Sequence, residues 1–174
     1  NTKLETLTLA ATKVKKLDFS NNPELKSILI GSESLESVIF KNNTKLTSLN
    51  ALSLKNVKQK PDFSNFPELI SLSLDYYPWK SFAIPTSKKL NSLSFQYSEF
   101  FKEIDVHENV KLRSFTLFNC SAISKITYFE GQQCKANTTN CHAIESVFIP
   151  REVPADIASA VSDAALKSYL ISVA

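Results

Sequence analysis

The chain has 174 residues, 43% of them apolar and 21% charged, which excludes a disordered polypeptide and allows one domain with a full hydrophobic core. The formal net charge is only +3, and every basic residue except Arg113 and Arg151 is a lysine. Nucleic-acid binders favour clustered charge and bidentate arginine, so we predict no nucleic-acid partner. Two glycines exclude Gly-rich phosphate loops, and no apolar run reaches the ~18 residues that span a membrane.

An internal repeat organises the chain. Residues 17–30 (LDFSNNPELKSILI) return 44 positions later as residues 61–74 (PDFSNFPELISLSL), and residues 1–7 (NTKLETL) return after 42 positions as residues 43–49 (NTKLTSL). The second spacing is two units of 21, and the first is two units plus a short insertion. Because Asn1 falls inside a repeat, we expect the chain to be a piece of a longer protein with residues upstream.

Apolar triplets recur in two interleaved series. The first series is Leu4/Leu7/Leu9, Leu25/Ile28/Ile30, Leu46/Leu49, Leu69/Leu72/Leu74, Leu90/Leu93/Phe95 and Leu112/Phe115/Leu117. The second is Val14/Leu17/Phe19, Leu35/Val38/Phe40, Phe63, Trp79/Phe82/Ile84, Phe101/Ile104/Val106 and Ile123/Ile126/Tyr128. Their alternation with polar residues predicts two short strands per turn of about 21 residues. Such a unit cannot bury its apolar face alone, so we predict that successive turns stack in parallel as a solenoid.

Two segments break the period, and a different pattern closes the chain. Residues 50–60 hold two or three extra positions and predict a bulge or loop. Residues 130–142 (EGQQCKANTTNCH) are polar and predict a loop insertion that projects from one turn. Residues 144–149 predict one more strand. In residues 150–174, helical spacing after Pro154 and alternation over residues 169–173 predict a helix and strand that cap the open end of the core.

The repeat spacing resembles that of a known family. The pattern L-x-x-L-x-L-x-x-(N/C), with Asn22, Asn43, Asn109 and Cys120 at the ninth position, resembles a leucine-rich repeat. The phrases LDFSNNPEL, VIFKNNTKL and IDVHENVKL are similar to the 21-residue repeats of secreted and surface proteins of gut Bacteroidetes. The resemblance covers about residues 1–129. It implies a right-handed, mainly parallel β leucine-rich-repeat solenoid as a single domain over residues 1–174, with repeats to residue 149.

The resemblance also implies a function and a location. Stacked strands present a broad, rigid array of side chains, which suits macromolecular partners. We therefore expect a non-enzymatic recognition or adhesion module, secreted or at the bacterial cell surface, that binds an extracellular protein or glycan as a monomer without a cofactor. A second role stays open, in which the coil is a structural spacer or stalk segment of a larger surface protein.

Aromatic residues single out one candidate binding patch. Tyr76 and Tyr97 follow the triplets in equivalent positions of consecutive turns, with Asn119 next in line and Phe118 beside it. The neighbouring row of hydroxyl side chains, which is almost uncharged, completes the predicted patch with Ser73, Ser94 and Thr116. Two interpretations remain: an exposed recognition surface, or rings that fold over the turn and cap the core.

The remaining reactive side chains predict structure more than chemistry. Cys134 and Cys141 flank a short polar loop; a disulfide is the favoured interpretation in an exported protein, and a metal site with His142 lacks a fourth ligand. Cys120 is expected to be a buried thiol. His107 follows Asp105 by two residues and predicts a solvated surface pair. No nucleophile, base and orienting group converge in a motif, so we predict neither an enzyme nor a metal site.

Overall fold

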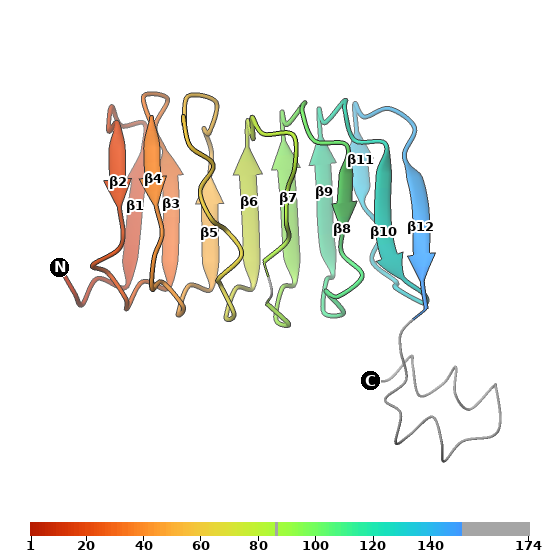
Figure 1. Ribbon diagram of the computed structural model, residues 1–174, viewed down its shortest axis with the longest axis horizontal. Helices are drawn as coiled ribbons and strands as arrows, with labels where there is room; N and C mark the ends of the chain where they lie inside the picture. The colour runs from red at the N-terminus through yellow and green to blue at the C-terminus, as the bar shows by residue number, and fades with distance from the viewer. Residues whose placement is uncertain (86, 151–174) are drawn as a thin grey trace, which may run out of the picture.

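The protein folds as a parallel β-solenoid, seen in a computed structural model that describes residues 1–85 and 87–150. The strands lie across the long axis of the coil and follow one another along it (Figure 1). All secondary structure in the described residues is strand, and the predicted capping helix and last strand, in residues 150–174, lie outside them apart from Pro150.

The six triplets of the first series form six strands of a seven-stranded parallel sheet, here called the longer sheet, and this confirms the predicted stacking. Its strands, in spatial order, are β1 (Thr6–Ala10), β3 (Ser27–Gly31), β5 (Ser48–Ala51), β6 (Ser71–Asp75), β7 (Ser92–Gln96), β9 (Ser114–Phe118) and β11 (Asn137–Thr139). Thr6 pairs with Ser27 and Ser71 with Ser92, each 21 residues away. Ser48 pairs with Ser71, 23 residues away, so the loop after β5 absorbs the two extra positions predicted for residues 50–60.

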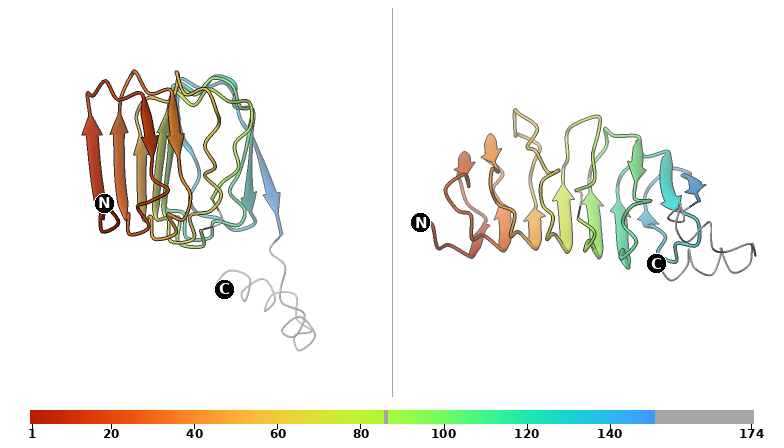
Figure 2. Two further views of the ribbon diagram at one scale, coloured as in Figure 1. Left: turned by 60° about the vertical axis from the view of Figure 1, so that its left-hand side comes forward. Right: turned by 60° about the horizontal axis from the view of Figure 1, so that its bottom comes forward.

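The second series forms strands only towards the two ends of the coil. β2 (Lys16–Asp18) pairs with β4 (Ser37–Ile39), and β10 (Lys125–Phe129) lies between β8 (Glu103–Asp105) and β12 (Glu145–Ile149). Figure 2 shows these strands across the interior from the longer sheet. In the described part of the middle turns this side has no strand, so the prediction of two strands per turn is wrong there. Pro61, Pro78 and Pro85 lie in this part, and proline has no N–H to donate to a ladder.

The interior is a continuous column of apolar side chains contributed by every turn. Leucines at one equivalent position are almost completely buried, namely Leu25, Leu46, Leu69, Leu90 and Leu112. Aromatic rings fill the middle turns, where Tyr77, Phe95 and Phe101 are fully buried and the centroids of Phe95 and Phe101 are 5.0 Å apart. The Tyr77 hydroxyl donates to the Ser81 carbonyl at 2.7 Å, so its burial leaves no polar atom unpaired. Rings thus support the side of the coil where the ladder is interrupted.

The predicted loop at residues 130–142 contains a strand, which corrects that prediction. β11 pairs with β9 in register, and Thr138 takes the position that Leu117 holds one turn earlier. The leucine pattern is lost because Ala136 and Thr138 occupy its positions, although β-branched threonine suits a strand. A second signal was present in the sequence: residues 119–123 read NCSAI and residues 140–144 read NCHAI, 21 positions apart.

Candidate recognition site at the ends of β6, β7 and β9

A left-handed residue follows most strands of the longer sheet. Ala11, Tyr76, Tyr97, Asn119 and Asn140 have φ between 51° and 54°. Hydrogen bonds to the next turn of the coil hold this backbone corner in place. Tyr76 N–H donates to the Gln96 carbonyl at 2.8 Å, and Tyr97 N–H donates to the Phe118 carbonyl at 2.9 Å. Asparagine tolerates this conformation, whereas a bulky side chain such as tyrosine rarely adopts it. The same backbone corner therefore presents one side chain per turn at the strand ends.

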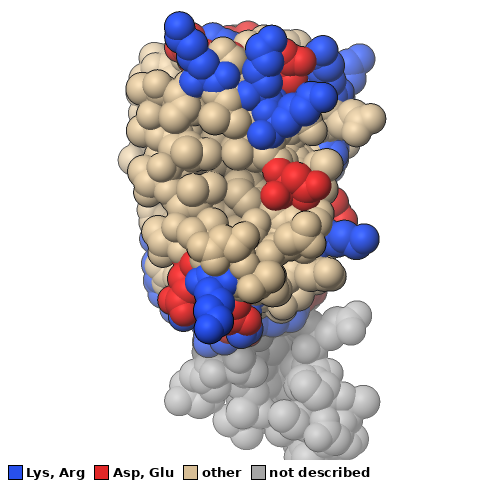
Figure 3. Space-filling model, turned by 90° about the vertical axis from the view of Figure 1, so that its left-hand side faces the viewer, with Lys and Arg blue, Asp and Glu red and all other residues tan. Residues whose placement is uncertain are grey.

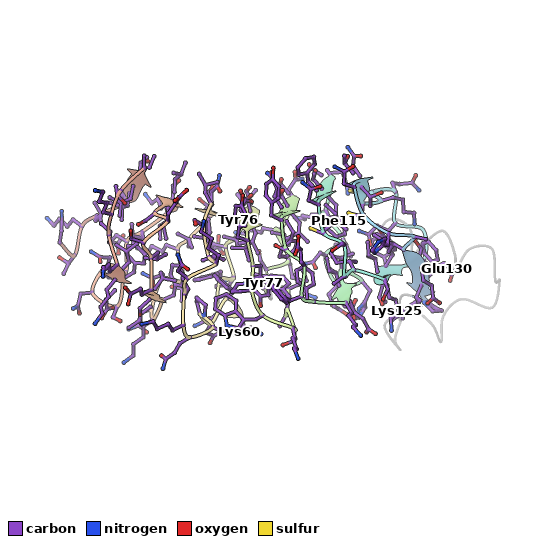
Figure 4. All side chains as sticks on the ribbon, turned by 90° about the horizontal axis from the view of Figure 1, so that it is seen from above. Lys60, Tyr76, Tyr77, Phe115, Lys125 and Glu130 are labelled. Carbon is purple, nitrogen blue, oxygen red and sulfur yellow. The ribbon has the colours of Figure 1, made fainter. Side chains whose placement is uncertain are left out.

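Tyr76, Tyr97 and Phe118 form what we call the aromatic row. The rings of Tyr76 and Tyr97 are stacked, with centroids 4.8 Å apart and planes at 10°, and Phe118 meets Tyr97 edge-on at 5.5 Å. Tyr76 and Tyr97 are 39% and 38% exposed. In Figure 4, Tyr76 lies nearer the longer sheet, whereas Tyr77 lies in the middle of the coil. The buried ring of this corner is therefore Tyr77, and the row lies on the surface.

The outer face of the longer sheet beside the aromatic row is polar but almost uncharged. Ser73, Ser94 and Thr116 are in register on adjacent strands and half-buried, as expected for an outward row. A second row of hydroxyls lies next to it, made of Thr6, Ser27, Ser48, Ser71, Ser92 and Ser114. Figure 3, which looks at the β1 end, shows charged side chains gathered at the rims and on the side of the shorter strands. The predicted patch residues thus share one continuous face, with Asn119 at its edge.

Asp75 is the one charged residue within the strands of this sheet, and the sequence reasoning missed it. It pairs with Gln96 in register, is only 8% exposed, and its Oδ1 has no hydrogen-bond partner in the structure. Burial raises the pKa of its carboxyl from 3.8 to about 6. The sequence did contain a signal for this residue, because Asp75 is a lone acidic residue on a face of serine and threonine. A buried, under-partnered carboxylate beside two left-handed tyrosines concentrates unfavourable local features at one place, as binding sites often do.

The histidine cluster on the opposite side is a network of polar contacts at the surface. His107 Nδ1 lies 2.6 Å from Asp105 Oδ1 and its Nε2 lies 3.1 Å from Glu108, which also pairs with Lys88 at 2.5 Å. The Ser87 hydroxyl lies 2.6 Å from the Leu69 carbonyl oxygen and 3.1 Å from that of Pro67, and its one hydrogen is donated to this pair of carbonyls. The predicted surface pair of Asp105 and His107 is confirmed. The Ser87 hydroxyl is hydrogen-bonded to backbone carbonyls.

The three cysteines are free thiols, so the predicted bridge between Cys134 and Cys141 is not formed in the structure. Cys134 Sγ faces the carbonyl of its own neighbour Lys135, whereas Cys141 Sγ faces the carbonyls of Leu117 and Thr139. Cys120 is fully buried, as predicted, and burial raises its pKa to about 11. His142 Nδ1 lies 2.6 Å from the Ser121 carbonyl oxygen. Across residues 1–85 and 87–150, no three His, Cys, Asp or Glu side chains gather as a metal ion would require.

No helix within the described ranges is long and apolar enough to cross a membrane. Comparisons of the chain with protein-family models, with curated proteins and with solved structures found no match.

Proposed function

We propose that the protein is a non-enzymatic recognition module that binds an extracellular protein or glycan through the aromatic row and the uncharged face beside it. The observation that carries this proposal is the left-handed conformation of Tyr76 and Tyr97. A left-handed residue with a side chain costs about 1–2 kcal/mol, and Ala11 and Asn119 show that the turn does not need tyrosine. Exposed aromatic rings kept at a strained position are what a contact surface uses.

The finer assignment is a leucine-rich-repeat solenoid that is secreted or displayed on a bacterial cell surface. The L-x-x-L-x-L spacing and the in-register turns of 21 residues support it. The polar, almost uncharged outer face of the longer sheet supports adhesion to a large partner, because hydroxyl groups cost less free energy to desolvate than charged groups do.

The packing of the rings favours a protein over a glycan as the partner. A sugar ring stacks on an open aromatic face, but one face of Tyr97 is covered by Tyr76 and its other neighbour in the row is Phe118. The remaining face of Tyr76 has Lys55 Nζ 5.6 Å from its centroid. The row therefore presents ring edges and hydroxyl groups, which suit the mixed polar and apolar side chains of a protein surface.

The test is a binding screen of the purified chain against extracellular proteins and glycans, followed by variants of the row. We expect Tyr76→Ala with Tyr97→Ala to abolish binding, because buried aromatic anchors carry about 1–4 kcal/mol each. The paired glycine variant should also lose binding yet fold more stably than the alanine pair, since glycine adopts positive φ without penalty. Phe100→Ala is the matched control, because Phe100 is 53% exposed but lies outside the row. A row variant that keeps binding and loses several kcal/mol of folding stability would show that the rings serve the core.

The spacer role remains the second candidate, and one observation favours it. Ion pairs link equivalent positions of consecutive turns, as in Lys26–Glu5, Lys45–Glu24 and Lys89–Glu68. In a solenoid each turn contacts only its neighbours, so turns that repeat these pairs can be added without altering the surface of the others. Absence of binding in the screen, both for the unaltered chain and for the variants of the aromatic row, would support this role.

A further inference from the structure

Cys120 and Cys141 occupy the same position in consecutive turns. Before them, Phe118 pairs with Thr139, 21 residues apart. After them, His142 Nδ1 contacts the Ser121 carbonyl, also 21 residues apart. The residues that immediately precede the two cysteines, Asn119 and Asn140, have φ values of 52° and 54°. The two cysteines are therefore neighbours along one column of the coil.

Both sulfur atoms point towards the same column of backbone carbonyls. Cys120 Sγ lies 3.4 Å from the carbonyl oxygen of Phe118 and 3.5 Å from that of Phe95. Cys141 Sγ lies 3.5 Å from the carbonyl oxygen of Thr139 and 3.6 Å from that of Leu117. Each thiol thus faces the carbonyl two residues before it and one in the preceding turn. Paired strands lie about 4.8 Å apart, which falls inside the Cα separation of about 4.4–6.8 Å that a disulfide accepts.

We propose that Cys120 and Cys141 are a redox pair that closes a cross-turn disulfide under oxidising conditions, in place of the bridge from Cys134. With glutathione disulfide as oxidant, the partly exposed Cys141 thiolate attacks one glutathione sulfur and releases the first glutathione thiol. Cys120 then gives up its thiol proton and attacks the Cys141 sulfur, which forms the protein disulfide and releases the second glutathione as a thiol. The two cysteines lose two electrons and two protons, and glutathione disulfide is reduced to two thiols.

The bond would fasten a weak part of the coil. In the turn that holds β11, Ala136 and Thr138 stand where most other turns have leucine, isoleucine or phenylalanine, so this turn buries little apolar surface. The disulfide closes a loop of about 21 residues and ties that turn to the one that carries Phe118. One end of the aromatic row would therefore become more rigid.

Peptide mapping tests the proposal, because trypsin separates the three cysteines. Cleavage after Arg113, Lys125, Lys135 and Arg151 places Cys120 in residues 114–125, Cys134 in 126–135 and Cys141 in 136–151. After incubation of the whole chain with glutathione disulfide and alkylation of free thiols, we expect peptides 114–125 and 136–151 to be linked and Cys134 to be alkylated. Reduction should lower the melting temperature by about 6–12 °C.

Two variants complete the test. Cys134→Ser should keep the link, and Cys120→Ser should abolish it while the chain stays folded. Serine is already present at this position one turn earlier, where the Ser98 hydroxyl lies 3.2 Å from the carbonyl oxygen of Gln96, two residues before it. A link between peptides 126–135 and 136–151, or three alkylated thiols after oxidation, would overturn the proposal.

Discussion

Asp75 shows how one side chain can make stability depend on pH. Its carboxyl has a pKa of about 6 in the folded protein and near 3.8 when the chain is unfolded. Between these values the folded state binds more protons than the unfolded state, so stability falls as pH rises from about 4 to 6 and stays low above that range. The difference amounts to at most about 3 kcal/mol.

We therefore predict that Asp75→Asn stabilises the protein at pH 7 and removes most of this pH dependence. The register partner Gln96 already carries a neutral amide at the same position one turn later. Urea unfolding at several pH values between 4 and 7 measures the effect. Asp62→Asn is the control and should destabilise the protein at pH 7, because hydrogen bonds from Ser64 stabilise the charged Asp62 carboxylate and lower its pKa. A gain for Asp75→Asn that is equal at every pH would contradict the electrostatic explanation.

At the scale of the element, buried asparagines hold the turns of the second series together. Asn43 is 2% exposed, its Nδ2 donates to the carbonyls of Phe19 and Asn22 at 3.0 and 2.9 Å, and its Oδ1 accepts from Lys41 N–H at 3.0 Å. Asn109 makes a similar bond to the Ser87 carbonyl. The ninth position of the repeat thus satisfies backbone groups of its own turn and of the previous one.

We predict that Asn43→Ala costs about 1–3 kcal/mol of unfolding free energy, because it leaves buried backbone groups unpaired. The adjacent Asn42 is exposed, and Asn42→Ala should change stability very little. Equilibrium denaturation of the two variants compares a buried and an exposed amide in the same turn. Equal small effects would mean that water replaces the Asn43 bonds.

Strands could be predicted from the sequence where leucine marks them, and were missed where other residues occupy the same positions. The longer sheet from β1 to β9 follows the leucine spacing, whereas β11 carries Ala136 and Thr138 at the same positions. The interruption of the second series was not predicted, because Trp79, Phe82 and Ile84 keep the apolar spacing although no strand forms there. One turn earlier, Pro61 lacks the N–H that a ladder needs. The positions of Tyr76 and Tyr97 followed from the period, but the burial of Asp75 did not. The loop after β5 lies against this strand end, where Leu54 N–H donates to the Asp75 carbonyl at 3.2 Å.

On the scale of the whole molecule, the position of a residue along the coil should set its contribution to stability. Leu7 and Leu72 occupy the same column of the longer sheet, yet Leu72 is fully buried between turns and Leu7, in the end strand β1, is half-exposed.

We predict that Leu72→Ala costs about 2–5 kcal/mol and Leu7→Ala about 1 kcal/mol, since a cavity forms only where the side chain is enclosed. Urea unfolding gives both values, and hydrogen exchange should show β1 opening before β6. Similar costs at both sites would mean that the end of the coil is covered as well as its middle.

The hydrogen bonds that join the turns run along the long axis of the coil (Figure 1). Tension applied between residues 1 and 150 would therefore pull on these hydrogen bonds directly and peel the turns away one after another, starting at an end of the coil. Each turn of 21 residues would release about 70 Å of extended chain. Under pulling, the coil would lengthen in a series of similar steps at low force, and it would behave as an extensible tether instead of a rigid rod.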